Sequence, residues 1–307
     1  MKKLLLNGML SFAFCGLVAS CTQSEQNDVI PTEVKEVKLT THLVAGSRAA
    51  MSQDDLDLYY TVYNSSTGAI VEKNTAKLQN LSAEGETSVT LTLQLEPTSS
   101  YDIAFWAQPK EVKCYDASNL KAIKINYNHA TCNHACNAYY GNVFDLRASQ
   151  QKEVTVSLKS PFCKVEVLTT TEDVAAASAL GYDINEMKSS MTVKGAATTF
   201  NALYGIAEGE KANVCLQPGN IPGNIQHIEG KSYQVLASDY VLGFQGHPAE
   251  VEVELSHNDL QKEPLRFTAG RAWLEYEETY SLYDHYLTQP VDFNVKVDGS
   301  IDSDINQ

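Results

Sequence analysis

The chain has 307 residues, of which 43% are hydrophobic and 20% are charged. This composition is typical of a globular protein, and 17 glycines and 9 prolines are too few for a collagen-like or low-complexity chain. The 23 basic residues stand against 38 acidic ones, which gives a net charge of −15. A chain this acidic has no general attraction to phosphate backbones or anionic lipid, so we expect no nucleic-acid partner.

The first residues have the pattern of a secretory signal. Lys2 and Lys3 precede an apolar stretch over residues 4–18, and the small residues Ala19 and Ser20 follow. A basic start, an apolar segment and small residues before the cut are the three parts of a signal peptide. We therefore predict a signal peptide over residues 1–20 and an extracytoplasmic protein.

Residues 18–21 (VASC) resemble the lipoprotein box of bacteria. Small residues fit the groove of a signal peptidase, and a thiol is the nucleophile that takes the diacylglycerol. We therefore expect Cys21 to be lipidated and to begin the mature protein, with the lipid anchor as its membrane contact. The alternative is an ordinary signal peptide followed by a chance cysteine. Thr22 stands where an aspartate would retain the protein in the inner membrane, which by analogy with sorting rules favours the outer membrane.

Residues 21–36 are polar and nearly free of bulky apolar side chains, so we predict a flexible tether there. The rest of the chain is dominated by alternation of apolar and polar residues, which predicts antiparallel strands with one buried and one wet face. The alternating segments are 56–62, 89–95, 154–158, 251–255 and 293–297. Residues 172–187 have a helical composition, but Gly181 favours an early end and thus a short helix or a turn.

The strand pattern predicts an all-β protein of two tandem β-sandwiches. We expect a strand pair, 153–158 with 162–168, to close the first sandwich, and we place a boundary near residues 169–171. The predicted domains are therefore residues 37–168 and residues 169–307, each of a size that is usual for a domain.

One cluster has the residue types of a metal site. His129, Cys132, His134 and Cys136 lie within one short segment, and two imidazoles with two sulfurs can hold zinc. Their spacing matches no standard zinc finger, and exported cysteines meet an oxidising compartment. We therefore expect no metal and no cofactor, and a polar loop that carries one disulfide or none. Cys114, Cys132 and Cys136 are the candidates for such a bond.

Catalytic motifs are missing from the sequence. No Gly-x-Ser-x-Gly elbow occurs, and no cysteine stands in a protease frame. The acidic residues Glu275, Glu277 and Glu278 suit a solvated strand face or loop better than an acid/base pair. We predict that the protein is not an enzyme.

The chain has 16 tyrosines, and six of them could form a stacking platform for sugar rings: Tyr139, Tyr140, Tyr276, Tyr280, Tyr283 and Tyr286. The simpler interpretation is that tyrosine suits half-buried strands, with its ring packed and its hydroxyl wet. We favour that interpretation. Trp106 and Trp273 are expected in core or inter-sheet packing.

Several segments together resemble the fimbrillin-type lipoproteins of Bacteroidales, the group of the type V pilins with their anchor and tip proteins. They follow one another behind the lipoprotein signal and span most of residues 40–298. The segments are DLDL at 55–58, YDIAFWA at 101–107, NLKAI at 119–123, PFCKV at 161–165, FNALYG at 200–205, LASDY at 236–240 and LTQPVDFNV at 287–295.

This resemblance implies transthyretin-like Greek-key sandwiches and a role in surface fimbriae or adhesion, as a pilus subunit, anchor or tip exposed on the outer membrane. It implies assembly with other fimbrial subunits or surface proteins by β-strand addition, without cofactor or catalysis. The alternative is a glycan-binding surface lipoprotein outside any polymer. Relatives tend to carry a basic stretch before the last strand, whereas residues 275–278 here are acidic (EYEE), so the detail of the C-terminal strands does not carry over.

The resemblance also implies proteolytic processing at Arg48. Pilins of this group are cut after an arginine near the mature N-terminus, which removes the first strand and opens a groove for a partner's strand. Here Arg48 and Ala49 join a short apolar strand candidate over residues 37–44 to the strand that begins at Leu56. Small residues surround Arg48, which favours an accessible side chain. The alternative is an uncleaved anchor or tip that keeps its lipid.

Overall fold

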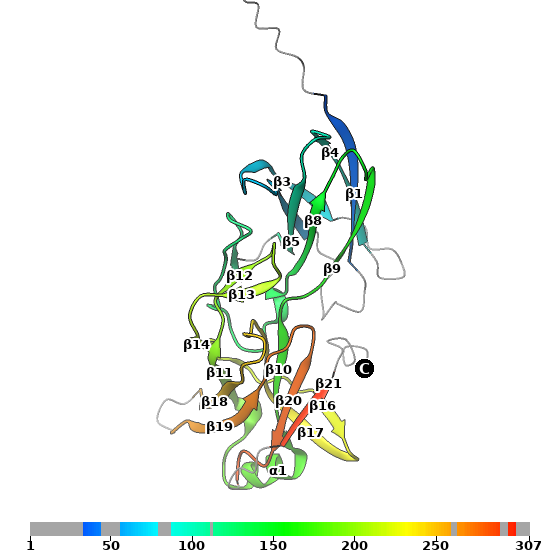
Figure 1. The fold of residues 1–307 in the computed structure, drawn as a ribbon. Helices are drawn as coiled ribbons and strands as arrows, with labels where there is room; N and C mark the ends of the chain where they lie inside the picture. The colour runs from blue at the N-terminus through cyan, green and yellow to red at the C-terminus, as the bar shows by residue number, and fades with distance from the viewer. Residues whose placement is uncertain are drawn as a thin grey trace, which may run out of the picture. The chain divides into compact units, whose positions relative to one another are not determined.

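A computed structural model describes residues 33–43, 56–78, 87–110, 113–258, 263–288 and 294–298. Strands dominate these residues, and the described part contains one α-helix, as Figure 1 shows. The predicted all-β sandwich fold is confirmed. The predicted signal peptide, most of the tether, Cys21, Arg48 and Ala49 lie outside the described residues. Within the described residues, no helix is both long enough and apolar enough to cross a bilayer.

Two sheets enclose the first core. One has the strand order β4-β1-β9 and the other the order β3-β2-β5-β8. Their strands are β1 (Lys35–Leu43), β2 (Leu56–Asn64), β3 (Ile70–Leu78), β4 (Thr87–Leu95), β5 (Tyr101–Pro109), β8 (Tyr139–Leu146) and β9 (Glu153–Leu158). Inward-facing residues from both sheets form one apolar cluster, which includes Leu39, Leu58, Leu93 and Phe105. This arrangement is a β-sandwich.

Two further sheets enclose a second and larger core. Their strand orders are β16-β17-β10-β20-β21 and β14-β11-β18-β19, with β15 paired to β11. The strands are β10 (Cys163–Thr170), β11 (Met187–Ala196), β14 (Ala212–Cys215), β15 (Gly219–Asn220), β16 (Ile225–Ile228), β17 (Lys231–Val241), β18 (Ala249–His257), β19 (Leu265–Ala272), β20 (Thr279–Asp284) and β21 (Asn294–Asp298). Residues from both sheets meet in one cluster with Val165, Met191 and Val253.

A small four-stranded sheet also contributes to the second core. Its order is β13-β12-β7-β6, from β6 (Tyr115–Asp116), β7 (Ile123–Ile125), β12 (Thr199–Asn201) and β13 (Ile206–Glu208). Phe200 of β12 and Trp106 of β5 lie with their ring centroids 5.8 Å apart. Because successive side chains of β5 point to opposite faces, Trp106 belongs to the second core and its neighbour Phe105 to the first.

The prediction that residues 153–158 and 162–168 pair and close the first sandwich is wrong. β9 pairs in parallel with β1, whereas β10 pairs with β17 and, in parallel, with β20. All residues of β10 are buried, so its pattern alone could not show which strands flank it. The division of the chain into two domains stays a prediction, and the pairing of β10 favours a boundary between Leu158 and Cys163.

The expected short helix is confirmed as α1 (Thr171–Ala179). Thr170 caps its N-terminus, since its side chain accepts a hydrogen bond from the backbone N–H of Asp173. Gly181 follows the helix with a positive φ of 90°, a conformation that glycine adopts at little cost. The buried Asp173 carboxylate accepts hydrogen bonds from Thr169 and Thr288, which ties α1 to β10 and to the segment after β20.

Candidate functional site

The strand β1, blue in Figure 1, is the central strand of its sheet and lies between β4 and β9. It pairs antiparallel with β4 along its whole length, from Lys35 opposite Leu95 to Leu43 opposite Thr87. On its other edge it pairs in parallel with β9, from Lys38 to Leu43. Both rows of backbone donors and acceptors of β1 are therefore used.

Alternate side chains of β1 point into the first core, between β4 and β9. Val37, Leu39, Thr41 and Leu43 are all buried in the first sandwich. On the outer face, the hydroxyls of Thr40 and Thr90 are 2.9 Å apart and bridge β1 to β4. Without β1, an apolar channel with unpaired strand edges on both sides would face solvent. Such a channel can bind an extended peptide through backbone hydrogen bonds and alternate side chains.

The four residues predicted as a metal-like cluster do not come together as one group. Cys136, at the end of the short 3₁₀ turn η2 (His134–Cys136), is disulfide-bonded to Cys114. Cys132 and His134 instead meet Ser238 of β17: the backbone N–H of Cys132 donates to the carbonyl of Ser238 at 2.9 Å. The Nε2 of His134 lies 2.9 Å from the Ser238 hydroxyl oxygen.

Burial controls the chemistry of these side chains. It raises the pKa of the Cys132 thiol, so this thiol stays protonated at neutral pH and is a poor nucleophile. Burial also lowers the pKa of His134, which favours the neutral imidazole. His129 lies beside Asp239, with 3.2 Å between its Nε2 and the carboxylate oxygen. The Ser238 hydroxyl beside His134 is buried, with 2% of the residue exposed.

The loop that carries residues 129–136 packs closely against β15. The backbone N–H of Thr131 donates to the carbonyl of Gln217 at 2.7 Å. A Cβ atom on Gly219 would overlap the carbonyl oxygen of Thr131 and approach its carbonyl carbon to 3.0 Å. Glycine is therefore required at position 219 for the two backbones to pack this closely.

Gly219→Ala is expected to lower the free energy of unfolding by about 1–3 kcal/mol, because the loop must move away from β15. Urea denaturation of the variant and the wild type measures this cost. Gly223→Ala is the matched control, since a Cβ there meets no atom within 4 Å. A Gly219 variant as stable as the Gly223 variant would contradict the close packing of the loop.

Of the six tyrosines considered as a sugar platform, five pack in the sandwiches and the sixth, Tyr283, is partly buried beside Tyr233. Tyr139, Tyr140, Tyr280 and Tyr286 are buried. Tyr276 packs against the second core, and its hydroxyl oxygen accepts a hydrogen bond from the backbone N–H of Ala207. Packing of the rings was the favoured interpretation, and the structure confirms it for these tyrosines. Trp106 is in the core as expected, whereas the prediction for Trp273 is wrong, because its surface is 52% exposed.

The acidic residues at 275–278 each bind a different group. Glu275 accepts from the backbone N–H of Gly246, Glu277 from that of Ser160, and Glu278 from the hydroxyl of Tyr280. These carboxylates hold turns in place, and none of these bonds joins two of them as an acid/base pair.

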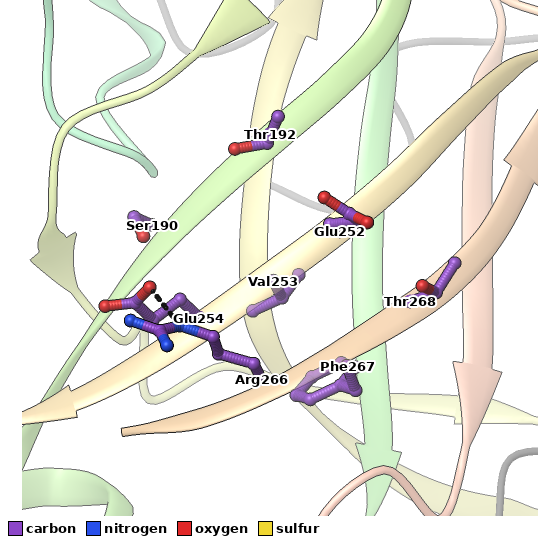
Figure 2. A pocket seen from close by; sticks show the side chains of 8 residues that line it. All are labelled: Ser190, Thr192, Glu252, Val253, Glu254, Arg266, Phe267 and Thr268. Atoms are coloured by element: carbon purple, nitrogen blue, oxygen red, sulfur yellow. Dashed lines mark hydrogen bonds and ion pairs between the residues drawn. The ribbon is translucent and has the colours of Figure 1, made fainter. Parts of the chain in front are cut away.

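A shallow depression of about 430 Å³ lies on the sheet of β11, β18 and β19. Figure 2 shows its lining side chains, with Glu254 and Arg266 paired at 2.7 Å across its floor. Glu252, the other charged residue of the lining, pairs with Lys194, and the depression is open, so it offers no built ligand site.

The chain matches one family model over most of its length. The model describes a family of unknown function (DUF6562) and matches residues 30–307. The chain belongs to this family. None of the curated proteins compared with the chain gives a significant match.

Solved structures with a similar fold come from Bacteroidales. A candidate adhesin, BT2657 from Bacteroides thetaiotaomicron, has 11% identity and a TM-score of 0.53, with 89% of this chain and 98% of that chain covered. The fimbrial anchor protein Mfa2 from Porphyromonas gingivalis has 13% identity and a TM-score of 0.49, with 87% and 99% covered. A candidate cell adhesion protein from Bacteroides uniformis has 11% identity and a TM-score of 0.48, with 87% and 97% covered. The likeness to BT2657 confirms the fold expected from the resemblance to fimbrillin-type lipoproteins.

Proposed function

We propose that this protein is a surface lipoprotein of fimbriae or adhesion that assembles with other subunits by β-strand addition. The observation that carries the proposal is the position of β1, a single strand that fills an apolar groove between β4 and β9. The fold shared with a candidate adhesin and the lipoprotein box at Cys21 support the same role. The proposal assigns no catalysis to the protein and no cofactor.

In this proposal β1 is removed and replaced by a strand of another subunit. A cut between Arg48 and Ala49 separates β1 from the rest of the chain, because the cut follows the end of β1 in the sequence. Release of β1 exposes the inner faces of Leu91 and Leu93 on β4 and of Val156 on β9. A strand from a neighbouring subunit then restores both the hydrogen bonds and the apolar contacts.

The glycan-binding alternative loses its main support, because four of its six tyrosines are buried. We therefore propose protein subunits, rather than polysaccharide, as the partners of the groove.

Arg48→Ala is expected to abolish processing and to remove high-molecular-weight polymer from the cell surface. The N-terminus of the surface form and the ladder in mild detergent are the measurements. Wild type should begin at Ala49, and the variant should keep a blocked N-terminus at Cys21. Arg147→Ala is a matched control, since Arg147 is an exposed arginine that directly follows β8, away from the proposed cleavage segment. A blocked N-terminus at Cys21 in the wild type would reject cleavage and leave an uncleaved anchor, tip or separate lipoprotein.

In the uncleaved Arg48→Ala background, Cys21→Ser is expected to release the protein from membranes in detergent partitioning and to leave the fold intact. The lipid attached at Cys21 is the proposed hold on the outer membrane, and a serine hydroxyl at this position is not modified in the same way. Acyl labelling of the variant tests the lipid attachment, and circular dichroism tests the fold. Retention of both label and membrane partitioning would contradict the lipid anchor.

A further inference from the structure

A second group of side chains, apart from the groove of β1, has the composition of a metal site. The cluster has one ligand atom from each of three residues, Cys114, His129 and Cys136. These three atoms lie within 4.8 Å of one another. Cys114 stands just before β6, His129 follows β7 and Cys136 ends η2, so separate segments bring them together. In the structure the two sulfur atoms are joined as a disulfide.

The imidazole of His129 lies beside a buried carboxylate. Its Nε2 lies 3.2 Å from the Oδ1 of Asp239, and the side chains are only 9% and 1% exposed. A nitrogen that donates to a carboxylate carries the ring proton, so Nδ1 keeps its lone pair. That Nδ1 is buried and has no hydrogen-bond partner within the described chain. In many metal sites, a histidine binds the metal through one ring nitrogen and donates a hydrogen bond to a carboxylate through the other. That hydrogen bond fixes the orientation of the ring.

We propose that reduction of the Cys114–Cys136 disulfide converts this cluster into a zinc site, with both thiolates and His129 as ligands and Asp239 as the group that orients the imidazole. Reduction takes two electrons and two protons from a dithiol, which is itself oxidised to a disulfide. Zinc then displaces the two thiol protons, which pass to solvent. Thiolate and imidazole ligands select zinc over calcium and magnesium, which prefer oxygen. Three protein ligands leave one tetrahedral position for solvent.

The distances in the cluster suit this conversion. Tetrahedral zinc with bonds of about 2.3 Å to sulfur places two thiolates about 3.7 Å apart. The ligand atom of His129 lies within 4.8 Å of both sulfur atoms. The sulfurs of a disulfide stand about 2.0 Å apart, so reduction must separate them by only about 1.7 Å.

Hydrogen bonds to backbone carbonyls hold each of the three segments. The N–H of Asn126 donates to the carbonyl of Cys114 at 2.7 Å, and the N–H of Gln217 donates to that of His129 at 2.8 Å. The hydroxyl of Tyr115 donates to the carbonyl of Cys136. These bonds do not involve the sulfur atoms, so they persist when the disulfide is reduced. The site is thus preorganised for a ligand in its reduced form.

The experiment is a cobalt titration of the full chain, purified in mild detergent, before and after reduction. The reduced protein is prepared with a phosphine under nitrogen, freed of the phosphine and titrated with Co²⁺, an optical probe for zinc sites. We expect one equivalent to bind with a tetrahedral, thiolate-ligated spectrum that Zn²⁺ abolishes. The oxidised protein should give no such spectrum. Zn²⁺ should also raise the melting temperature of the reduced protein.

Three variants identify the ligands. His129→Ala should lose the cobalt spectrum, and Asp239→Asn should weaken Co²⁺ binding by about 10–100-fold. Cys132→Ser is the matched control, because Cys132 lies in the same loop but outside the cluster, and it should bind as wild type does. Binding that survives His129→Ala, or that is lost in Cys132→Ser, overturns the proposal.

The fold of the reduced protein is followed by circular dichroism in the same samples. If reduction unfolds the chain, Zn²⁺ should restore the β spectrum, because metal binding then contributes folding free energy. A reduced protein that stays folded without binding Co²⁺ overturns the proposal, and so does one that Zn²⁺ fails to refold. None of these results depends on strand addition at β1.

Discussion

Trp106→Ala is expected to lower the free energy of unfolding by about 3–5 kcal/mol, the range for truncating a large buried aromatic side chain. Trp106 is fully buried on β5, and its ring centroid lies 5.2 Å from that of Tyr115. Its Nε1 donates to the Oε1 of the buried Gln108 at 2.9 Å. The substitution therefore creates a cavity and also leaves a buried polar acceptor without its donor.

Urea denaturation followed by circular dichroism measures this effect. Trp273→Ala is the matched control, since the same side chain is removed from a half-exposed position. We expect the control to cost less than about 1 kcal/mol. Equal costs for the two variants would show that Trp106 is not a core residue.

Leu93→Ala is expected to cost about 2–5 kcal/mol, because this buried side chain of β4 packs in the first core opposite Val37 of β1. Thr92→Ala, one residue away on the exposed face, should cost far less. Equilibrium unfolding in urea compares the two. Similar losses would mean that the register of β4 is shifted by one residue, since such a shift exchanges the two faces.

The strands that alternate strictly were predictable from the sequence. The segments at 56–62, 89–95 and 251–255 became β2, β4 and β18. In β4 and β18 one face is buried and the other is more exposed, which imposes a period of two. Partners were harder to predict. β10 is buried on both faces, so its composition reports burial but does not show that β17 and β20 flank it.

The contacts between side chains far apart in the sequence were also hard to predict. The sequence indicated that Cys114, Cys132 and Cys136 were the candidates for a bond, but loop spacing does not show which sulfurs meet. Asp239 was not predicted beside His129, because it belongs to β17, far along the chain. A buried aspartate within an apolar strand was the available signal, since a carboxylate there needs a partner. Proximity across sheets depends on the topology, which periodicity does not encode.

The two-sided pairing of β1 has a mechanical consequence. A pull on the chain before Lys35, directed along the strand, loads the hydrogen bonds to β4 and β9 in shear. In this geometry the bonds along both edges must yield together, whereas a strand peeled from its end loses them one at a time. The rate of forced unfolding, rather than equilibrium stability, then decides how long the subunit withstands flow. In an uncleaved form held to a surface through Cys21, the strand that is proposed to be exchangeable is also the one that bears the force.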